Sequence, residues 1–348
     1  MAKQLPLVQA LLSPKAYPER PQKIDMMQTQ MSFIFLTGEH VYKIKKPVDL
    51  GYLDYTTLEK RRHFCHQEVI LNRRLCPEVY LDVVTITDYN GKYSINGKGN
   101  VFEYAVKMLQ LPQDRMMDNL AREQRISPDM IDRVAQKLAE FHRSAATSQE
   151  IAQYGDISFL KINTEENFSQ TEKYVDISIA RQYYNDITVY TRGFIETSTP
   201  LFRQRIVEGR IRDCHGDLHA AHVCFTDGIQ IFDCIEFNDR FRYCDVASEI
   251  AFLAMDLDYH ERRDLSQRFI EAYVKASGDR EMSELLNFYK CYRAYVRGKV
   301  ESFKYDDTHI TQAEKGEALN KAKRYFELAE SYVSEDVGNR KPHMENQK

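Results

Sequence analysis

The sequence contains no apolar run long enough to cross a membrane, and its first residues, MAKQLPLVQALLSPK, lack the long apolar region of a signal peptide. Its cysteines form no Cys-x-x-Cys pair, which argues against a disulfide framework or a zinc ribbon. With a formal net charge of -4, the chain has no overall basic field, so nucleic acid is not an expected partner. We therefore expect a reduced, cytoplasmic protein that binds neither membranes nor nucleic acid.

Glycine motifs that bind phosphate are also missing. The sequence has no Walker A motif, and no glycine-rich loop precedes its first strands. With 348 residues, 43% of them hydrophobic, the chain can nevertheless bury a sizeable core in one or two domains. Four of its cysteines recur at ten-residue intervals from Cys214 to Cys244. This spacing matches no metal site, and small buried thiols near a core hairpin explain it more simply.

The most informative stretch runs from Arg212 to Glu236 and reads RDCHGDLHAAHVCFTDGIQIFDCIE. Two β-prone runs in it, 223–225 and 229–232, flank an Asp-Gly turn, which is a strong hairpin signal. Antiparallel pairing of these runs would bring the loop before the first strand next to the residue after the second. Asp217 and Asp233 are therefore expected at the same end of one hairpin.

Two carboxylates delivered in this way suit phosphoryl transfer. Asp217 would orient or deprotonate an attacking hydroxyl, and Asp233 would hold magnesium on a nucleotide. The pattern fits the protein-kinase signature H-R-D-L-x-x-x-N followed by D-F-G, with three departures. Gly216 replaces Arg, His222 replaces Asn, and Cys234–Ile235 replaces Phe-Gly.

The segment HGDLH, followed by the hairpin and by FDCIEFNDRFRYCDVASEIAFL, resembles the aminoglycoside phosphotransferase and choline kinase branch of the protein-kinase-like fold. Within that branch it is most similar to bacterial aminoglycoside phosphotransferase family enzymes that are often fused to a P-loop kinase domain. The resemblance covers about Phe33 to Lys304 and is most specific from Cys214 to Asp245. It implies ATP and Mg²⁺ as cofactors and a small-molecule acceptor, which it does not identify. It also raises a separate P-loop kinase as a partner.

Residues 1–108 are interpreted as a small, strand-rich lobe. Its predicted strands are 31–36, 41–46, 79–87, 92–95 and 101–108. In kinases, a lysine on the third strand holds the α- and β-phosphates, with a small apolar residue two positions before it. Lys43, preceded by Val41, fits that spacing best, and Lys45 is the alternative. The alternative without a function is that both lysines are solvated side chains on an edge strand.

A helix is predicted over Thr56–Leu75, where Thr56 and Glu59 form a capping box. Glu68 lies three positions from both Cys65 and Leu71, so its carboxylate falls on the apolar stripe of this helix. A buried carboxylate is costly without a partner. The resemblance supplies one, because the third-strand lysine of kinases pairs with a glutamate of this helix.

Residues 109–334 are interpreted as a larger, mainly helical lobe, and residues 335–348 as a disordered polar tail. A hinge is expected at Leu109–Pro112. The helix that begins at Pro128 ends in LAEFH, and its last residue, His142, is expected to make structural hydrogen bonds. Asp245 opens another helix, and the resemblance implies that it braces the catalytic loop.

The stretch 290–304 places Lys290, Arg293 and Arg297 at i, i+3 and i+7, on one helix face. This row could bind an anionic acceptor, although a solvated helix face is the simpler interpretation. Another open alternative concerns Gly216–His219, which resembles the G-D-x-H motif of metallophosphoesterases. That class needs a further Gly-Asn-His-type segment downstream, and the sequence has none.

The sequence thus predicts an α+β, two-lobed protein-kinase-like fold that phosphorylates a hydroxyl of a small molecule with ATP. Asp217 is the predicted catalytic residue, and Lys43 with Glu68 positions the nucleotide. Asp233 binds magnesium, and His222 occupies the second metal position beside the reaction. The alternative is a nucleotide-binding pseudokinase that regulates another protein. His222 and the missing glycine loop favour it, while the intact aspartates oppose it.

Overall fold

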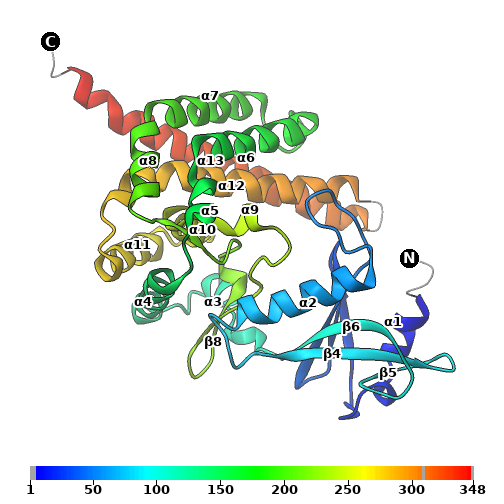
Figure 1. Cartoon of the computed structure of the whole chain (residues 1–348). Coiled ribbons are helices and arrows are strands. Elements are labelled where there is room, and N and C mark those ends of the chain that lie inside the picture. Colours follow the sequence, from blue (N-terminus) through cyan, green and yellow to red (C-terminus); the bar gives the residue numbers. More distant parts are fainter. Residues whose placement is uncertain (1–4, 308–309, 346–348) are drawn as a thin grey trace. The chain divides into compact units, whose positions relative to one another are not determined.

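The computed structural model describes residues 5–307 and 310–345. The chain forms two compact units, Met1–Asn119 with Ala221–Arg242, and Leu120–Ala220 with Tyr243–Lys348. The first unit holds the main sheet, and the second consists mainly of helices (Figure 1). The expected boundary after Met108 thus lies eleven residues later, and the hairpin segment groups with the first unit.

The main sheet has six strands in the order β1-β2-β3-β6-β4-β5, and each neighbouring pair is antiparallel. The strands are β1 (Asp25–Gln28), β2 (Ser32–Leu36), β3 (His40–Lys45), β4 (Tyr80–Tyr89), β5 (Lys92–Ile95) and β6 (Asn100–Leu109). The five predicted strands are confirmed. The edge strand β1 was not predicted, because all its residues are exposed and give no apolar signal.

The alternation predicted for β3 places its side chains on two different faces. Tyr42 and Ile44 pack in a core that includes Leu7 and Leu11 of the short helix α1 (Leu5–Leu11). Val41 instead packs in a core that contains residues of α2 (Leu58–Asn72). The lysines of β3 share the phase of Val41, so they point toward the side of the sheet that α2 covers.

Helix α2 begins two residues later than predicted. Its N-cap is Thr57, whose side chain accepts a hydrogen bond from the backbone N–H of Lys60. Thr56 does not cap the helix, because its hydroxyl and its N–H both donate to Asp54 Oδ1. The capping box read from the sequence was therefore shifted by one threonine.

The central hairpin is confirmed, with β8 (Val223–Phe225) antiparallel to β9 (Ile229–Ile231). The two strands turn where Thr226 N–H donates to Gly228 O. The remaining short helices are η1 (Pro14–Ala16), η2 (Gln113–Arg115), α3 (Met117–Arg122), η5 (Ala220–His222) and α9 (Asp239–Arg242). Cys224 also forms an isolated bridge with Met116, which explains why the hairpin groups with the first unit.

In the second unit, α10 is the central helix, and every residue from Val246 to Asp258 is buried. Two short strands, β7 (Ile211–Asp213) and β10 (Tyr243–Asp245), pair antiparallel ahead of it. The other helices are α4 (Pro128–Ser144), α5 (Gln149–Ala152), η3 (Gln153–Gly155), α6 (Ile157–Thr171), η4 (Glu172–Tyr174), α7 (Arg181–Thr197), α8 (Thr199–Val207), α11 (Arg263–Ser277), η6 (Glu281–Leu285), α12 (Leu286–Phe303), η7 (Lys304–Asp306) and α13 (Gln312–Glu345).

Helix α13 continues into the segment that was predicted to be a disordered tail. The tail expected from residue 335 onward is helical as far as Glu345, and residues 346–348 lie outside the described residues. Among the residues that the structure describes, no helix combines the length and the apolar character needed to span a membrane.

Candidate active site

A buried cluster of charges joins β3, α2 and the segment after β9 in the first unit. Lys43 Nζ lies 2.8 Å from Glu68 Oε1 and 2.6 Å from Asp233 Oδ1. Lys45 Nζ lies 2.6 Å from the other oxygen of the same carboxylate, Glu68 Oε2. Lys45 also forms an ion pair with Glu236, and the Tyr55 hydroxyl donates to that carboxylate at 2.5 Å. Glu68 therefore bridges two lysines, which explains how its carboxylate is accommodated in the core.

The two lysines differ in what else they can reach. The side chain of Lys45 is 1% exposed, and both of its carboxylate partners are buried. Lys43 is 12% exposed and contacts Asp233, whose side chain is 40% exposed. Burial alone would lower the pKa of Lys43, yet the carboxylates of Asp233 and Glu68 raise it, so the side chain stays charged. Lys43 is thus the lysine that faces an accessible carboxylate.

Burial would raise the pKa of Glu68, and Lys43 and Lys45 lower it below its usual range. The carboxylate is therefore ionised in the folded protein. Removing one partner of a buried ion pair leaves an uncompensated charge, which typically costs several kcal/mol. The cluster as a whole holds the segment after β9 against β3 and α2.

Asp233 occupies an unusual backbone conformation, with φ at 64°, in the left-handed region that few non-glycine residues adopt. Two neighbouring side chains hold this turn. The Tyr80 hydroxyl accepts the N–H of Asp233 at 3.2 Å, and Asn72 Oδ1 accepts the N–H of Cys234 at 2.9 Å. The carboxylate is thereby directed outward from a fixed backbone. Its second oxygen lies 3.5 Å from His222 Nε2.

Asp217 belongs to the second unit and lies in the loop between β7 and η5. Glu249 of α10 holds this loop, because its Oε1 accepts the backbone N–H groups of His215 and Gly216, each at 2.7 Å. From the other side, Arg293 Nη1 donates to Gly216 O at 3.3 Å. Asp217 Oδ2 lies 3.6 Å from His219 Nε2. The backbone before Asp217 is therefore fixed by two charged groups.

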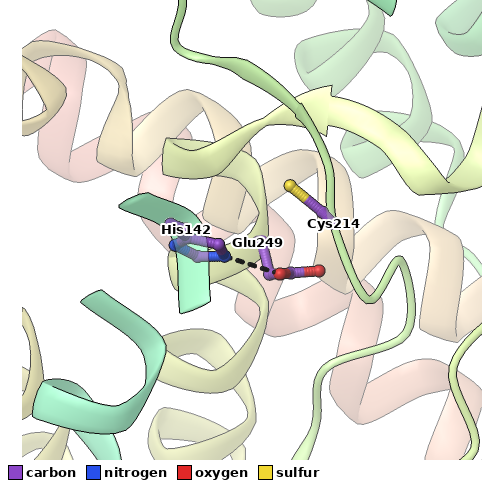
Figure 2. Close-up of side chains that lie close together, drawn as sticks. All are labelled: His142, Cys214 and Glu249. Carbon is purple, nitrogen blue, oxygen red and sulfur yellow. Dashed lines mark hydrogen bonds and ion pairs between the residues drawn. The ribbon is translucent and has the colours of Figure 1, made fainter. Parts of the chain in front are cut away.

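His142, Cys214 and Glu249 lie together in the interior of the second unit (Figure 2), with ligand-type atoms close enough to share a metal ion. Their bonding argues against that use. His142 Nε2 bonds Glu249 Oε2 at 2.7 Å, its Nδ1 bonds the Tyr273 hydroxyl at 2.8 Å, and the other Glu249 oxygen holds the loop. Burial also raises the pKa of the Cys214 thiol far above its usual range, so no thiolate is offered. We interpret this cluster as a brace, and the structural role expected for His142 is borne out.

The resemblance implied that Asp245 braces the loop that carries Asp217, but the acid that contacts this loop in the structure is Glu249. The Asp245 side chain caps α10 through Ala247 N–H and pairs with Arg205 at 2.6 Å. Glu249, one turn later, contacts the loop instead. An acidic residue near the start of a helix can cap the helix or bond a neighbouring loop. The sequence does not show which of the two acids makes which contact, because the position of the loop depends on the fold.

Four of the predicted site residues, Lys43, Glu68, Asp233 and His222, come together in the first unit. Asp217 is described with the second unit. Sequence reasoning missed Tyr55, Glu236 and the pair that holds the Asp233 turn. The Glu236 carboxylate is occupied by Lys45 and Tyr55.

Glu249→Gln is predicted to lower the free energy of unfolding at pH 7 by about 1–3 kcal/mol. Burial would raise the pKa of Glu249, but the hydrogen bond and charge of His142 and the loop N–H groups lower it to about 2. The unfolded carboxyl titrates near pH ~4.3. The stabilisation is therefore complete above about pH 5 and is lost as the pH falls toward 2.

Denaturant titrations at several pH values would check this, with the exposed Glu271→Gln as the matched control. The difference between wild type and Glu249→Gln should shrink on acidification. A difference that stays constant between pH 7 and pH 3 would show that the carboxylate charge is not what holds the loop.

No protein-family model matches the chain. Over 311 residues it is 30% identical to uncharacterized proteins of Mycobacterium tuberculosis and Mycobacterium bovis, covering 89% of this chain and 60% of theirs. The chain thus spans about 60% of the length of these relatives.

Solved structures show the fold. A choline/ethanolamine kinase family protein from Mesorhizobium loti is 12% identical over 94% of this chain and 99% of its own, with a TM-score of 0.53. A microcompartment-associated aminopropanol kinase (12%; 95% and 98%) and a glucosamine kinase (11%; 91% and 76%) each give 0.51. The chain therefore has the two-lobed protein-kinase-like α+β fold of these structures.

Proposed function

We propose that this protein is an ATP-dependent phosphotransferase that acts on a hydroxyl of a small molecule. The observation that carries the proposal is the contact of Lys43 with both Glu68 and Asp233. A lysine paired with a helix glutamate and placed beside a metal-binding aspartate is the arrangement that kinases use on a nucleotide. The glucosamine kinase of the same fold was solved with ADP and inorganic phosphate, which is consistent with nucleotide use.

In this proposal each charged side chain has one task. Lys43 binds the α- and β-phosphates, and Glu68 keeps its ammonium oriented and charged. Asp217 accepts or orients the proton of the attacking hydroxyl, in a loop whose backbone Glu249 and Arg293 hold. Lys43 and Asp233 form an ion pair in the structure. On binding, Lys43 would exchange the carboxylate for phosphate oxygens, and Asp233 would be released toward the metal.

The donor set at Asp233 suits magnesium. Mg²⁺ prefers hard oxygen ligands and commonly takes one or two carboxylates, with water and nucleotide oxygens completing the shell. Asp233 offers a partly exposed carboxylate on a fixed backbone. When bound, the ion would neutralise charge on the transferred phosphoryl group. His222 suits this ion less well, because imidazole favours softer metals.

The second candidate function is a nucleotide-binding pseudokinase that regulates a partner, with a P-loop kinase as the candidate partner. His222 at the usual Asn position and the missing glycine-rich loop favour it. Asp217, Asp233 and the intact Lys43–Glu68 pair favour catalysis. The two functions share nucleotide binding and differ in turnover.

Calorimetric titration with Mg-ATP, followed by an ATP-turnover assay against a library of hydroxyl compounds, tests the proposed function. We expect wild type to bind Mg-ATP and Asp233→Asn to bind it at least tenfold more weakly. Asp233 contacts the metal in this proposal, whereas ATP without metal should bind both proteins alike. If the wild-type protein bound no nucleotide, both the phosphotransferase and the pseudokinase function would be refuted. Tight binding without turnover of any acceptor would leave only the pseudokinase.

Substitutions of the two β3 lysines should differ in their effects on ATP binding and on stability. Lys43→Met is expected to raise the KM for ATP at least tenfold, because Lys43 is the lysine beside Asp233, and to lower Tm less than Lys45→Met, because Glu68 keeps Lys45 as a partner and Asp233 is partly exposed. Lys45→Met should instead cost about 3–5 kcal/mol of stability, since it strands the buried carboxylates of Glu68 and Glu236. Thermal unfolding and ATP kinetics on both variants check this. A reversed ranking would move the phosphate-binding role to Lys45.

His222→Asn restores the residue usual at this position of the kinase signature. We expect it to keep or raise magnesium-dependent turnover, because an amide oxygen is a harder ligand than imidazole. Turnover should be compared with Mg²⁺ and with Mn²⁺, using His66→Asn on α2 as a control. A collapse of activity in His222→Asn alone would mean that the imidazole itself takes part in the reaction.

A further inference from the structure

The basic row on α12 is not the solvated face that the sequence favoured. Lys290 is buried and pairs with Asp258 at 2.9 Å. Arg293 is buried and donates to Ser248 and to Gly216 O. Two members of the row are therefore fully used inside the second unit. Arg297, one turn beyond Arg293, is the member that remains to be explained.

Arg297 has a hydrogen-bond donor that the fold leaves unused. Its Nε is buried and has no hydrogen-bond partner, and it forms no ion pair with any carboxylate in the described part of the chain. The guanidinium stacks on the ring of Tyr325 at 5.6 Å. Burial would lower the pKa of Arg297, and the Tyr325, Asp217 and Asp256 side chains raise it, so the charge is kept. The unsatisfied Nε is nevertheless costly unless an acceptor atom bonds it.

The contacts around Arg297 place it beside the loop that carries Asp217. Arg293, four residues earlier on the same helix face, donates to Gly216 O, immediately before Asp217. At the other end of the loop, Asp256 accepts the N–H of Ala220 at 2.8 Å. The Tyr325 hydroxyl lies 3.4 Å from the second oxygen of Asp256. The ring that supports Arg297 is thereby tied to the end of the same loop.

We propose that Arg297 binds a negatively charged group of the acceptor, a carboxylate or a phosphate, next to the hydroxyl that receives the phosphoryl group. The proposal rests on the phosphotransferase function proposed above. Arg297 shares the second unit with Asp217, the residue that meets the acceptor hydroxyl, whereas Lys43 and Asp233, which serve the nucleotide, belong to the first. The planar guanidinium fork matches the oxygens of a carboxylate or a phosphate.

This assignment separates the acceptor from those of the aminopropanol and glucosamine kinases, which are named for amine-bearing compounds. A protonated amine beside the reacting hydroxyl would be repelled by Arg297. An acid or a phosphate ester in the same place would supply the missing partner and satisfy the unpaired Nε. The expected acceptor class is therefore hydroxy acids or phosphorylated alcohols.

The test compares small hydroxyl compounds that differ mainly in charge. Glycerate and glycerol 3-phosphate are the anionic probes, glycerol is neutral, and ethanolamine and choline are cationic. Binding of each is measured by calorimetry, with and without a non-hydrolysable ATP analogue, and phosphorylation is measured with Mg-ATP. We expect at least one anionic probe to bind and the cationic probes not to bind. Asp217→Asn should abolish transfer and retain this binding, because Asp217 acts on the hydroxyl.

Arg297→Met should weaken anion binding about 10- to 100-fold, the range for loss of a charge-assisted contact. Its affinity for Mg-ATP should not change. Arg297→Lys keeps the charge but not the planar guanidinium, so its affinity for the anion should lie between those of wild type and Arg297→Met. It replaces Arg297→Met in the test if the methionine variant unfolds. Lys299→Met is the control, because it removes a neighbouring cation of α12 that bonds Asn167 and Gln170 instead.

Three outcomes overturn the proposal: no anionic probe binds, a cationic probe is preferred, or Arg297→Met behaves like Lys299→Met. A loss confined to Mg-ATP affinity also overturns it, because Arg297 would then serve the nucleotide. Failure of wild type to bind Mg-ATP refutes the phosphotransferase function instead. The titration of anions without nucleotide still decides the role of Arg297 in that case.

Discussion

The first unit depends on one shared carboxylate, Glu68. It neutralises Lys43 and Lys45 at once, so two lysines of a single strand can remain charged on the buried face of the sheet. Each lysine then contacts a different acid of the segment after β9, Asp233 or Glu236. The position of that segment relative to β3 and α2 follows from these pairs. A neutral side chain at position 68 would leave Lys43 with Asp233 alone and Lys45 with Glu236 alone, and would remove the group that both lysines share.

The second unit also depends on one buried carboxylate. Glu249 is a buried anion that is satisfied by backbone N–H groups and by His142, and it holds the loop before Asp217. This loop is thus fixed through its main chain. In both units a buried charge positions a neighbouring carboxylate that is itself only partly buried.

Sequence analysis identified those features whose cause is local. Strand phase placed Lys43, helix spacing placed Glu68, and the Asp-Gly turn placed the hairpin that ends before Asp233. The features it missed depend on partners far along the chain. Tyr80 and Asn72 hold the Asp233 turn from about 150 residues away, and no periodicity in the sequence links them. The capping threonine of α2 was misplaced because Asp54 competes for Thr56, a choice that two adjacent threonines do not reveal.

The partners of the buried lysines and arginines are the part of the structure that bears on the choice of substrate. In the first unit, Lys43 is paired with the partly exposed Asp233, whereas Lys45 is paired with the buried Glu68. In the second unit, Lys290 is paired with Asp258 and Arg293 is hydrogen-bonded to Ser248 and Gly216 O. Arg297 differs from both, because its Nε is buried without a hydrogen-bond partner beside the loop that carries Asp217. In the proposal made above, an anionic acceptor supplies the oxygen atom that this donor lacks.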